Sequence, residues 1–534
     1  MPQAAPWRRG APLTAAALPP SMGPLLALAL TLALALALPG PASAQRRPGG
    51  PLDASPAGGR DPRLLGSVAG DAAAIRADTA LLRANASAEA SAAAAKAPDQ
   101  AWADFKARWG RSYGAEEEGA HSAAFARALA FTAAYNANAS ASAFMRLGPL
   151  SDATPDEFRR LHGIDPSAGN ATAARALLTT APAAELGAGG GSGSGSSALP
   201  PGPPSPSAVN WVARGRVAPI ANQGQCGDCW AFAATAVVES MQAIAAATNA
   251  TSLSPQQVLD CTPPRFKGNG TSSADGCGGA SELWAGLVFP YARLGLATAQ
   301  QQPYGGAQGA CSDGVGLAVN LTGVGAVAGG SEAALMAALN AGPIVVSVAA
   351  SSAAFQYYGG GVFDDFAACA ACRDPSGAPT TCVVDHAVAL VGYDSAEGYW
   401  ILRNSWGPDW GIGGYMLLAM GTRIGHSTGM CRILEYGAAS ASVGGGGPVP
   451  SYWEASLPSR AVVNQVFYGG QPLAFDLMPP SPPPAPPRPP GSAPPPPSPP
   501  GGAAGAPRPR PWASGAVAAL LGLALALAAG GARG

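Results

Sequence analysis

The stretch NQGQCGDCWAFAATAVVES, residues 222–240, holds two cysteines three positions apart, directly before an apolar run rich in alanine and valine. From Cys229 onward the apolar residues recur at helical spacing, which predicts a buried helix that begins at this cysteine. A thiol at a helix N-terminus is a candidate nucleophile, because the helix dipole and the free N–H groups stabilise its thiolate. The same spacing also fits a redox pair with Cys226, or a zinc half-site completed by the CAAC of residues 369–372.

The composition limits how much of the chain folds. Of its 534 residues only 12% are charged, whereas 71 are glycine and 54 are proline. Segments made mainly of Ala, Gly, Pro and Ser cannot bury enough apolar surface to form a core. The folded part is therefore smaller than the whole chain. The formal net charge of -1 gives no indication of a nucleic-acid partner.

The N-terminus has the pattern of a secretory signal. An apolar run at 25–38 follows two arginines and precedes an Ala-x-Ala pattern at 42–44, which favours a cleaved signal peptide over 1–44 rather than a membrane anchor. Whether translation starts at Met1 or Met22 stays open. Asn-x-Ser/Thr sequons, which fit a secreted glycoprotein, start at Asn85, Asn138, Asn170, Asn249, Asn269 and Asn320.

The remaining chain divides by composition. We expect, in order, a low-complexity segment at 45–98, a helical segment at 99–163, a linker at 164–207, the main globular block at 208–440, an irregular extension at 441–478, a Pro-rich stalk at 479–512 and a hydrophobic tail at 513–534. The apolar part of the tail, 516–529, is short for a bilayer. It fits a glycosylphosphatidylinositol attachment signal, and equally a low-complexity tail.

A nucleophilic thiol needs a base, and the globular block offers two histidines. His386 lies in the strand-like run VVDHAVALVGYD and His426 in a polar loop, so the more rigid His386 is favoured. Asn404, in YWILRNSWGPDWGIGGYM, follows another strand-like run and can orient the imidazole without adding charge. Trp406 can shield that bond from water. The structural alternatives are a core histidine, a turn asparagine and a core tryptophan.

Six motifs carry a resemblance to a known family. They are NQGQCGDCWAF, LSPQQVLDC, GCGG, GPIVVSV, DHAVALVGYD and RNSWGPDWGIGGYM. In this order they resemble the papain-family cysteine endopeptidases of the cathepsin L-like kind, which carry a long propeptide. The resemblance covers about 101–163 and 208–440. It implies an α+β, two-lobed fold, with a helical left lobe and an antiparallel β-barrel-like right lobe, preceded by a helical inhibitory propeptide.

The resemblance also implies a role for each matching residue. Cys229 would be the nucleophile, His386 the acid and base, and Asn404 the group that orients the imidazole. Gln223 would donate to the oxyanion together with the Cys229 backbone N–H. The substrate-binding positions would be Gly227, Gly278, Gly279, Ala280, Asp385, Trp406, Ser347 and Tyr436.

Nine cysteines lie between 226 and 431, and an odd count in a secreted protein indicates disulfides and one free thiol. By the resemblance, Cys226 pairs with Cys277 and Cys261 with Cys311. Cys431 would pair with one of three cysteines, and the remaining two would pair together; the three are Cys369, Cys372 and Cys382. This arrangement leaves Cys229 free.

The chain departs from the family pattern near the nucleophile. Asp228 stands where the family has Ser or Ala, and its carboxylate is expected to raise the pKa of the neighbouring thiol. Ala280 replaces a glycine, and its side chain would narrow the cleft. Ser281, Glu282, Ser347 and Tyr436 make the substrate pocket atypical, so the preferred side chain is not assigned.

The helical motif of the family's propeptide has six positions, which here are Glu117, His121, Phe125, Ala128, Thr132 and Asn136. Three of the six match the motif: Glu117, Phe125 and Asn136.

We expect a secreted zymogen of a monomeric cysteine endopeptidase, with protein or peptide substrates, its own propeptide as inhibitor, and no metal or organic cofactor. Acid pH would trigger self-processing by protonating Asp and Glu. The compartment would be lysosomal, vacuolar or extracellular, with a lipid anchor open. The alternatives are a peptide ligase of the same fold, a non-catalytic wall-associated scaffold, and a redox protein.

Overall fold

The computed structural model describes residues 67–164, 206–444 and 455–456, apart from short stretches at 139, 264–275, 281–284, 294, 313–316, 328–329, 374–378 and 422–426. The predicted signal peptide, most of the linker, the stalk and the tail lie outside the described residues, as do His426, Ser281 and Glu282. No helix in the described ranges is long and apolar enough to cross a membrane.

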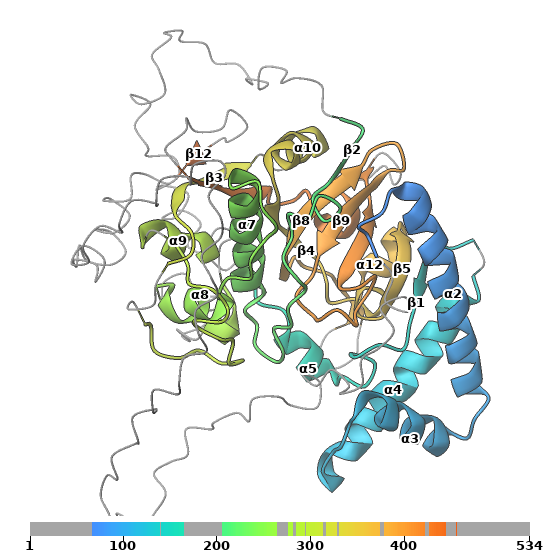
Figure 1. Cartoon of the computed structure of the whole chain (residues 1–534). Helices are drawn as coiled ribbons and strands as arrows, with labels where there is room; N and C mark the ends of the chain where they lie inside the picture. Colours follow the sequence, from blue (N-terminus) through green and yellow to red (C-terminus); the bar gives the residue numbers. More distant parts are fainter. Residues whose placement is uncertain are drawn as a thin grey trace, which may run out of the picture. The chain divides into compact units, whose positions relative to one another are not determined.

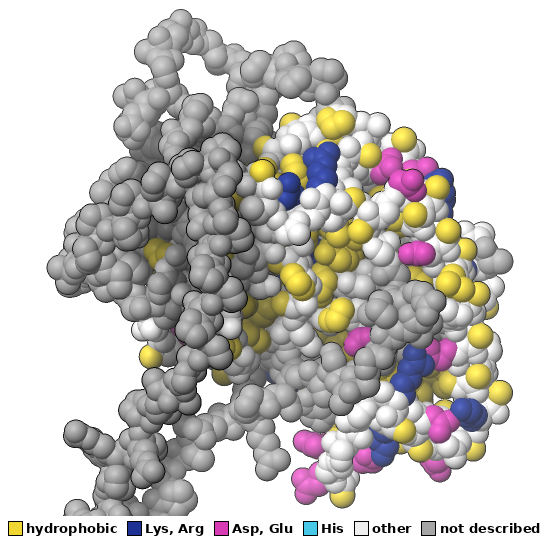
Figure 2. Space-filling view, viewed as in Figure 1, with side chains coloured by type: hydrophobic (Ala, Val, Ile, Leu, Met, Phe, Trp, Pro, Cys, Tyr) yellow, Lys and Arg dark blue, Asp and Glu magenta, His cyan; other side chains and the backbone are white. Residues whose placement is uncertain are grey.

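The described segment up to residue 164, here called the prosegment, is mainly helical. Its elements are α2 (Ala72–Ala94), α3 (Pro98–Trp109), α4 (Ala115–Asn136), β1 (Ala143–Met145) and α5 (Pro155–Arg160). The helix α2 lies in the Ala-rich segment 45–98, for which composition alone predicts no fold. Aromatic rings of α3 and α4 form the local core, with Phe105 and Phe125 at 4.6 Å between ring centroids. On the face shown in Figure 2, acidic and basic side chains are mixed over these helices.

A buried ion pair fixes the turn that leads into α5. The Arg111 and Asp152 side chains are both fully buried, with Nε and Oδ2 3.3 Å apart. Arg111 Nη2 also donates to the Pro149 carbonyl at 2.7 Å, and His121 Nδ1 lies 2.8 Å from the Asp152 carbonyl. A buried charge is tolerated only when it is paired and hydrogen-bonded in this way. The helix α5 then begins at a capping box in which Thr154 and Glu157 satisfy each other's backbone N–H groups.

The helical lobe of the globular block is built around α7 (Cys229–Ala245), whose start and length confirm the predicted helix. The other helices of this lobe are α8 (Pro255–Cys261), η3 (Gly276–Gly278) and α9 (Ala285–Ala292). In Figure 1, α7 lies between α8 and α9 on one side and the sheet on the other. Every residue of α7 from Cys229 to Ser240 is buried, as expected for a helix with apolar residues all round.

The second lobe is a sheet with ten strands among the described residues. Its strands are β2 (Ala208–Asn210), β3 (Leu321–Val327), β4 (Ile344–Val348), β5 (Tyr358–Phe363), β8 (His386–Asp394), β9 (Tyr399–Arg403), β10 (Tyr415–Ala419), β11 (Ala438–Val443), β12 (Ala455–Ser456) and the prosegment strand β1. The order β1-β5-β10-β9-β8-β4-β11-β3-β12 is an open path with β2 on β8. Its pairs are antiparallel except β5 with β10. The antiparallel lobe is therefore confirmed, as an open sheet and not a closed barrel.

The short remaining elements are α10 (Glu332–Ala341), α11 (Ala353–Gln356), α12 (Phe366–Ala370), the hairpin β6 (Ala371–Arg373) with β7 (Pro379–Thr381), and η4 (Met430–Arg432).

The prosegment adds a strand to the edge of the sheet. The strand β1 pairs antiparallel with β5, with Phe144 opposite Gly360. The side-chain amide of Asn136, at the end of α4, donates to the Met145 carbonyl at 2.9 Å and accepts from its N–H at 2.8 Å. A Cβ on Gly360 would lie 2.7 Å from the Phe144 ring, so the contact requires glycine there. Covering an edge strand also removes an open pairing surface.

Disulfides join Cys226 to Cys277, Cys261 to Cys311 and Cys369 to Cys431. The first two are the predicted pairs, and the third identifies the partner of Cys431, which the sequence left open. Cys382 is also disulfide-bonded. The side chain of Cys372 lies outside the described residues, so the fourth pairing stays a prediction. The free cysteine of the described chain is Cys229.

Candidate active site

The thiol of Cys229 lies at the first residue of α7, where this helix meets the sheet. It is fully buried, and the Ala387 N–H of β8 donates to its sulfur at 3.4 Å. Burial raises the pKa of the Cys229 thiol to about 12, and the charge of Asp228 adds to this direction. The effect of Asp228 therefore has the predicted sign, but burial is the larger cause.

His386 is the first residue of β8, and its imidazole is hydrogen-bonded through one nitrogen only. Its Nε2 lies 2.8 Å from Asn404 Oδ1, and the Ser405 N–H donates to the same oxygen at 2.8 Å. An oxygen that accepts from a backbone N–H is the carbonyl end of the amide, so Nε2 carries the imidazole proton. His386 Nδ1 is buried and has no hydrogen-bond partner, and is therefore the atom available to a thiol proton.

Trp406, predicted to shield this pair, packs against the His386 ring. Its ring lies 4.7 Å from the His386 ring between centroids, tilted by 35°, and the residue is 3% exposed. A low-polarity cover of this kind strengthens the hydrogen bond between His386 and Asn404.

Gln223, the expected oxyanion donor, is held from several sides. Its N–H donates to the Ser405 carbonyl at 2.9 Å, and Ser405 Oγ donates to its Oε1 at 2.6 Å. Its Nε2 donates to the Cys226 carbonyl at 2.8 Å and, in the prosegment, to the Leu161 carbonyl at 2.9 Å. The amide that would stabilise a developing oxyanion is thus bonded to a peptide carbonyl of the chain's own prosegment.

After Leu161 the prosegment runs between Ala280 and Asp385. The Ala280 N–H donates to the Gly163 carbonyl at 2.7 Å, and the Ile164 N–H donates to the Asp385 carbonyl at 3.0 Å. Ile164 and Ala280 form a parallel bridge. A Cβ on Gly163 would lie 1.7 Å from the Gly227 carbonyl oxygen, so only glycine fits at this crossing.

These contacts bring together most of the predicted substrate-binding residues. Gly227, Gly279, Ala280, Asp385 and Trp406 all lie against the prosegment backbone or side chains. Gly278 is exposed beside them, Ser347 is buried on β4, and Tyr436 is 41% exposed. The substrate-binding roles of all eight residues stay predictions.

Asp385 is held by the loop that follows β4. Its Oδ1 accepts from the Ala350 N–H at 2.8 Å, and its Oδ2 accepts from the Ser351 hydroxyl. Burial raises the pKa of this carboxyl to about 6. The Asp385 backbone carbonyl accepts from the Ile164 N–H, while the Asp385 side chain binds the loop after β4. The side chain therefore holds in place the backbone on which the prosegment lies.

Sequence reasoning missed His162, a prosegment residue in the motif PLSDATPDEFRRLHG. The His162 ring lies edge-on to His386 at 5.7 Å and to Trp406 at 5.9 Å between centroids, and Phe158 packs on it at 4.7 Å. Burial lowers the pKa of His162 to about 3. The pKa of His386 is also lowered to about 3, mainly by burial and secondly by the neighbouring His162. The signal in the sequence was a rare histidine next to a glycine.

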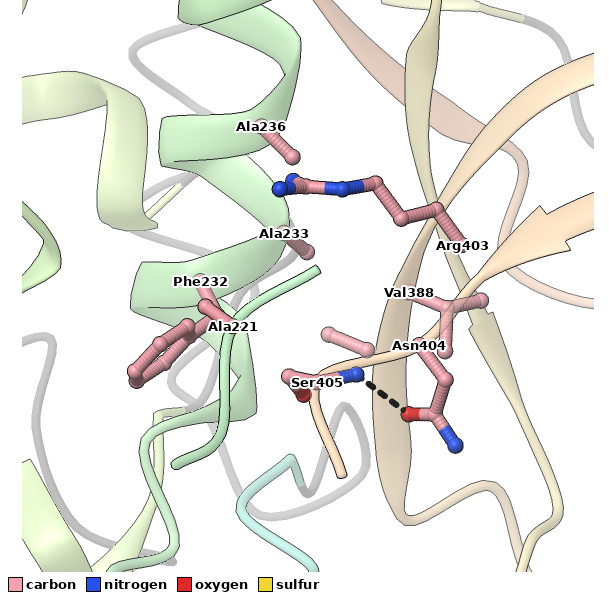
Figure 3. Close-up of a pocket in the computed structure, with 9 residues that line it drawn as sticks. Ala221, Phe232, Ala233, Ala236, Val388, Arg403, Asn404 and Ser405 are labelled. Atoms are coloured by element: carbon pink, nitrogen blue, oxygen red, sulfur yellow. Dashed lines mark hydrogen bonds between the residues drawn. The ribbon is translucent and has the colours of Figure 1, made fainter. Parts of the chain in front are cut away.

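A small cavity lies behind the site, between α7 and strands β8 and β9. Figure 3 shows Arg403 reaching from the sheet toward Ala233 and Ala236 of α7. Arg403 Nη2 lies 3.4 Å from Glu239 Oε2, and both side chains are buried. This ion pair joins the helix that carries the thiol to the strand that precedes Asn404. No group of three or more His, Cys, Asp or Glu side chains suited to a metal is found in the part of the chain that the structure describes.

A thiol, an imidazole with a free nitrogen, an amide that orients it and an amide donor on a peptide carbonyl together define a cysteine-protease type of site. The chain matches the family described as papain family cysteine protease over 205–441, and the cathepsin propeptide inhibitor domain over 102–158.

Among curated relatives, the cathepsin L-like proteinase of Phaedon cochleariae is 31% identical over 64% of this chain and 94% of that protein. Macrodontain-1 of Ananas macrodontes is 34% identical over 43% of this chain and 94% of that protein. Of several other curated relatives the chain spans only about three fifths of the length. One is the KDEL-tailed cysteine endopeptidase CEP2 of Arabidopsis thaliana, matched over 62% of its length at 35% identity. The solved recombinant stem bromelain precursor is 26% identical, with a TM-score of 0.50 over 65% of this chain and 99% of that one. The chain belongs to the papain family of cysteine proteases.

Proposed function

We propose that this chain is the zymogen of a cysteine endopeptidase. The observation that carries the proposal is the hydrogen bond from Gln223 Nε2 to the Leu161 carbonyl, beside the buried Cys229 and His386. A peptide carbonyl already lies at the amide donor that an acyl-transfer reaction needs. The prosegment is therefore both a stand-in for a substrate and its competitor.

In the proposed reaction, His386 Nδ1 takes the proton of the Cys229 thiol, and the thiolate attacks a peptide carbonyl carbon. The carbonyl oxygen gains negative charge, which Gln223 Nε2 and the Cys229 N–H would stabilise. The imidazolium then gives its proton to the leaving amine, and an acyl-enzyme remains. Water, deprotonated by the same imidazole, releases the acid and restores the thiol.

The pKa directions account for latency. In the buried site the thiol pKa is raised to about 12 and the His386 pKa is lowered to about 3, so both groups are neutral. When the prosegment leaves, water enters and both desolvation effects weaken. The thiolate and imidazolium can then form together, which activates the nucleophile.

Replacing Gln223 with alanine is expected to lower kcat of the processed enzyme by about a hundredfold or more, with little change in KM, because the donor acts mainly on the transition state. Steady-state kinetics on a fluorogenic peptide measures both constants. Gln225→Ala, two positions away, is the matched control and should stay near wild type. A Gln223→Ala enzyme with unchanged kcat would exclude this residue as the oxyanion donor.

Two alternatives remain distinguishable by experiment. A ligase of the same fold would pass the acyl group to an amine instead of water, so adding an excess of glycinamide should divert nearly all product to the amide. A peptidase should still give mainly the acid. A wall-associated scaffold would hydrolyse nothing after the prosegment is removed. The intact set of Cys229, His386, Asn404 and Gln223 favours an acyl-transfer enzyme over the scaffold, and the glycinamide experiment separates peptidase from ligase.

The route of the protein is part of the same proposal. We infer entry into the secretory pathway, with a lysosomal, vacuolar or extracellular destination, from the signal pattern at 1–44 and the disulfides of the globular block. The stalk and the tail, with its candidate lipid-anchor signal, lie outside the described residues.

A further inference from the structure

The carboxylate next to the nucleophile is not a helix cap. Asp228 occupies the N-cap position of α7, yet its side chain makes no capping hydrogen bond there. The residue is fully buried, and Tyr304 Oη donates to its Oδ2 at 2.8 Å. A buried carboxylate costs free energy unless it is hydrogen-bonded, so this contact is part of what makes Asp228 tolerable.

The same phenol reaches the residue that carries the oxyanion donor. Tyr304 Oη lies 2.9 Å from the backbone carbonyl of Gln223, so one hydroxyl proton is shared between this carbonyl and Asp228. The Tyr304 ring is fixed by Phe232, one turn into α7, in an edge-on contact at 4.8 Å. Tyr304 therefore bridges the N-terminus of α7 and the loop that holds Gln223.

Gln223 is thus positioned from two lobes. Ser405, which follows Asn404 on the sheet side, binds its backbone N–H and its side-chain oxygen. On the helical side, the Tyr304 hydroxyl contacts its backbone carbonyl, and Asp228 binds that hydroxyl. Donors of an oxyanion site act well only when they are held within a fraction of an ångström, so both attachments bear on the reaction.

We propose that Asp228 and Tyr304 are a positioning pair that sets Gln223, and through it the oxyanion site, relative to the nucleophile. This inference rests on the proposed peptidase function. It explains why the chain carries a carboxylate where the related motif has Ser or Ala. A serine side chain at 228 is too short to accept the hydrogen bond from the Tyr304 hydroxyl. An asparagine side chain reaches as far as aspartate but carries no charge.

The test compares three variants of the full chain after acid processing. Tyr304→Phe and Asp228→Ser are expected to lower kcat about tenfold with KM nearly unchanged, because the misplaced donor weakens only the transition state. Asp228→Asn should recover most of the loss in Asp228→Ser. The rate of Cys229 alkylation by iodoacetamide, measured across pH, reports the nucleophile separately from the oxyanion site.

The alkylation profile has its own expected result. Tyr304→Phe should leave the plateau rate near wild type, which shows an intact nucleophile. Asp228→Asn should move the midpoint to lower pH by removing a like charge, with Asp385 and His386 unaltered beside the thiol.

Unchanged kcat in Tyr304→Phe and Asp228→Ser, in an active wild type, would overturn this inference alone. A parallel fall of kcat and alkylation rate would also overturn it, because the pair would then support the fold around Cys229 and not Gln223. A processed, alkylatable wild type that cleaves no peptide would contradict the proposed function and this inference with it.

Discussion

Replacing His386 with alanine is expected to lower kcat by at least about a thousandfold. Without the ring, no nitrogen takes the proton of Cys229, and no acid protonates the leaving amine. Because the variant should not process itself, its prosegment would be removed by limited pepsin digestion, and hydrolysis of a fluorogenic peptide would then be followed.

Asn404→Ala is the graded comparison for this prediction. It keeps the imidazole but removes the oxygen, 2.8 Å from Nε2, that fixes its orientation, so its loss should be clearly smaller. Equal activity in His386→Ala and the parent would assign the base to another group. Equal losses in both variants would mean that orientation, and not proton transfer, is the main role of this pair.

The second large effect concerns His162 and the pH at which the prosegment leaves. A histidine with a pKa near 3 when buried and about 6.5 when free takes up a proton on release. Docking of the prosegment with a neutral His162 is fully favourable above pH 6.5. This contribution to docking is lost as the pH falls from 6.5 toward 3. By linkage, release at pH 4.5 is favoured about a hundredfold over release at neutral pH through this one group.

Other groups around His162 bear on the sign of this effect. His386, the first residue of β8, faces the His162 ring, Arg159 of α5 acts on it through its charge, and Asp385 lies just before β8, where its carbonyl binds Ile164. In the proposed mechanism Cys229 passes its proton to His386 when the prosegment leaves, so this pair takes up no net proton. Burial raises the pKa of Asp385, so its charge change opposes release at acid pH. Among these groups His162 is the one whose titration favours release at acid pH, and Asp385 reduces the net effect.

The measurement is the rate of self-processing of the full chain between pH 7 and pH 4.5, from intact mass. His162→Asn should remove most of the increase that the wild type shows as the pH falls, and His162→Leu should do the same with a different shape. Identical pH profiles in the wild type and both variants would show that another group senses the acid.

The expectation that Asp and Glu protonation loosens the prosegment needs refinement. Burial raises the pKa of Asp152, so protonation of this carboxyl is favoured in the folded prosegment and does not release it. Glu118 has its pKa lowered by hydrogen bonds from Lys106 and Trp102, which is the expected direction, but its side chain is 34% exposed, so solvent screens the effect. The buried imidazole in the cleft gives a larger response.

Features that depend on residues close together in the sequence were predictable, and contacts between residues far apart in the chain were not. The start of α7 at Cys229 and the strands β4, β8 and β9 were predictable, because runs of apolar residues at helical or strand spacing specify them. The bond between His386 and Asn404 was predictable from two motifs in a known order. The contact of Tyr304 with Asp228, 76 residues apart, was not, because neither residue stands in a pattern that refers to the other.

The same reasoning explains the partner of Cys431 and the prosegment contacts. Three cysteines lie within 369–382, and only the approach of α12 to η4 selects Cys369. The pairing of β1 with β5 and the position of His162 beside His386 depend on how two separate segments dock. Periodicity within each segment contains no information on that docking.

The measurement that tests the central claim most directly is acid treatment of the full chain, with the Cys229→Ala variant alongside, followed by cleavage of a fluorogenic dipeptide. The account predicts activity in the parent and none above background in the variant, even when its prosegment has been removed by another protease. No activity in either protein, with the prosegment gone and the fold intact, would contradict it. The protease fold would then serve as a scaffold, and Asp228 and Ala280 would be the first residues to revert.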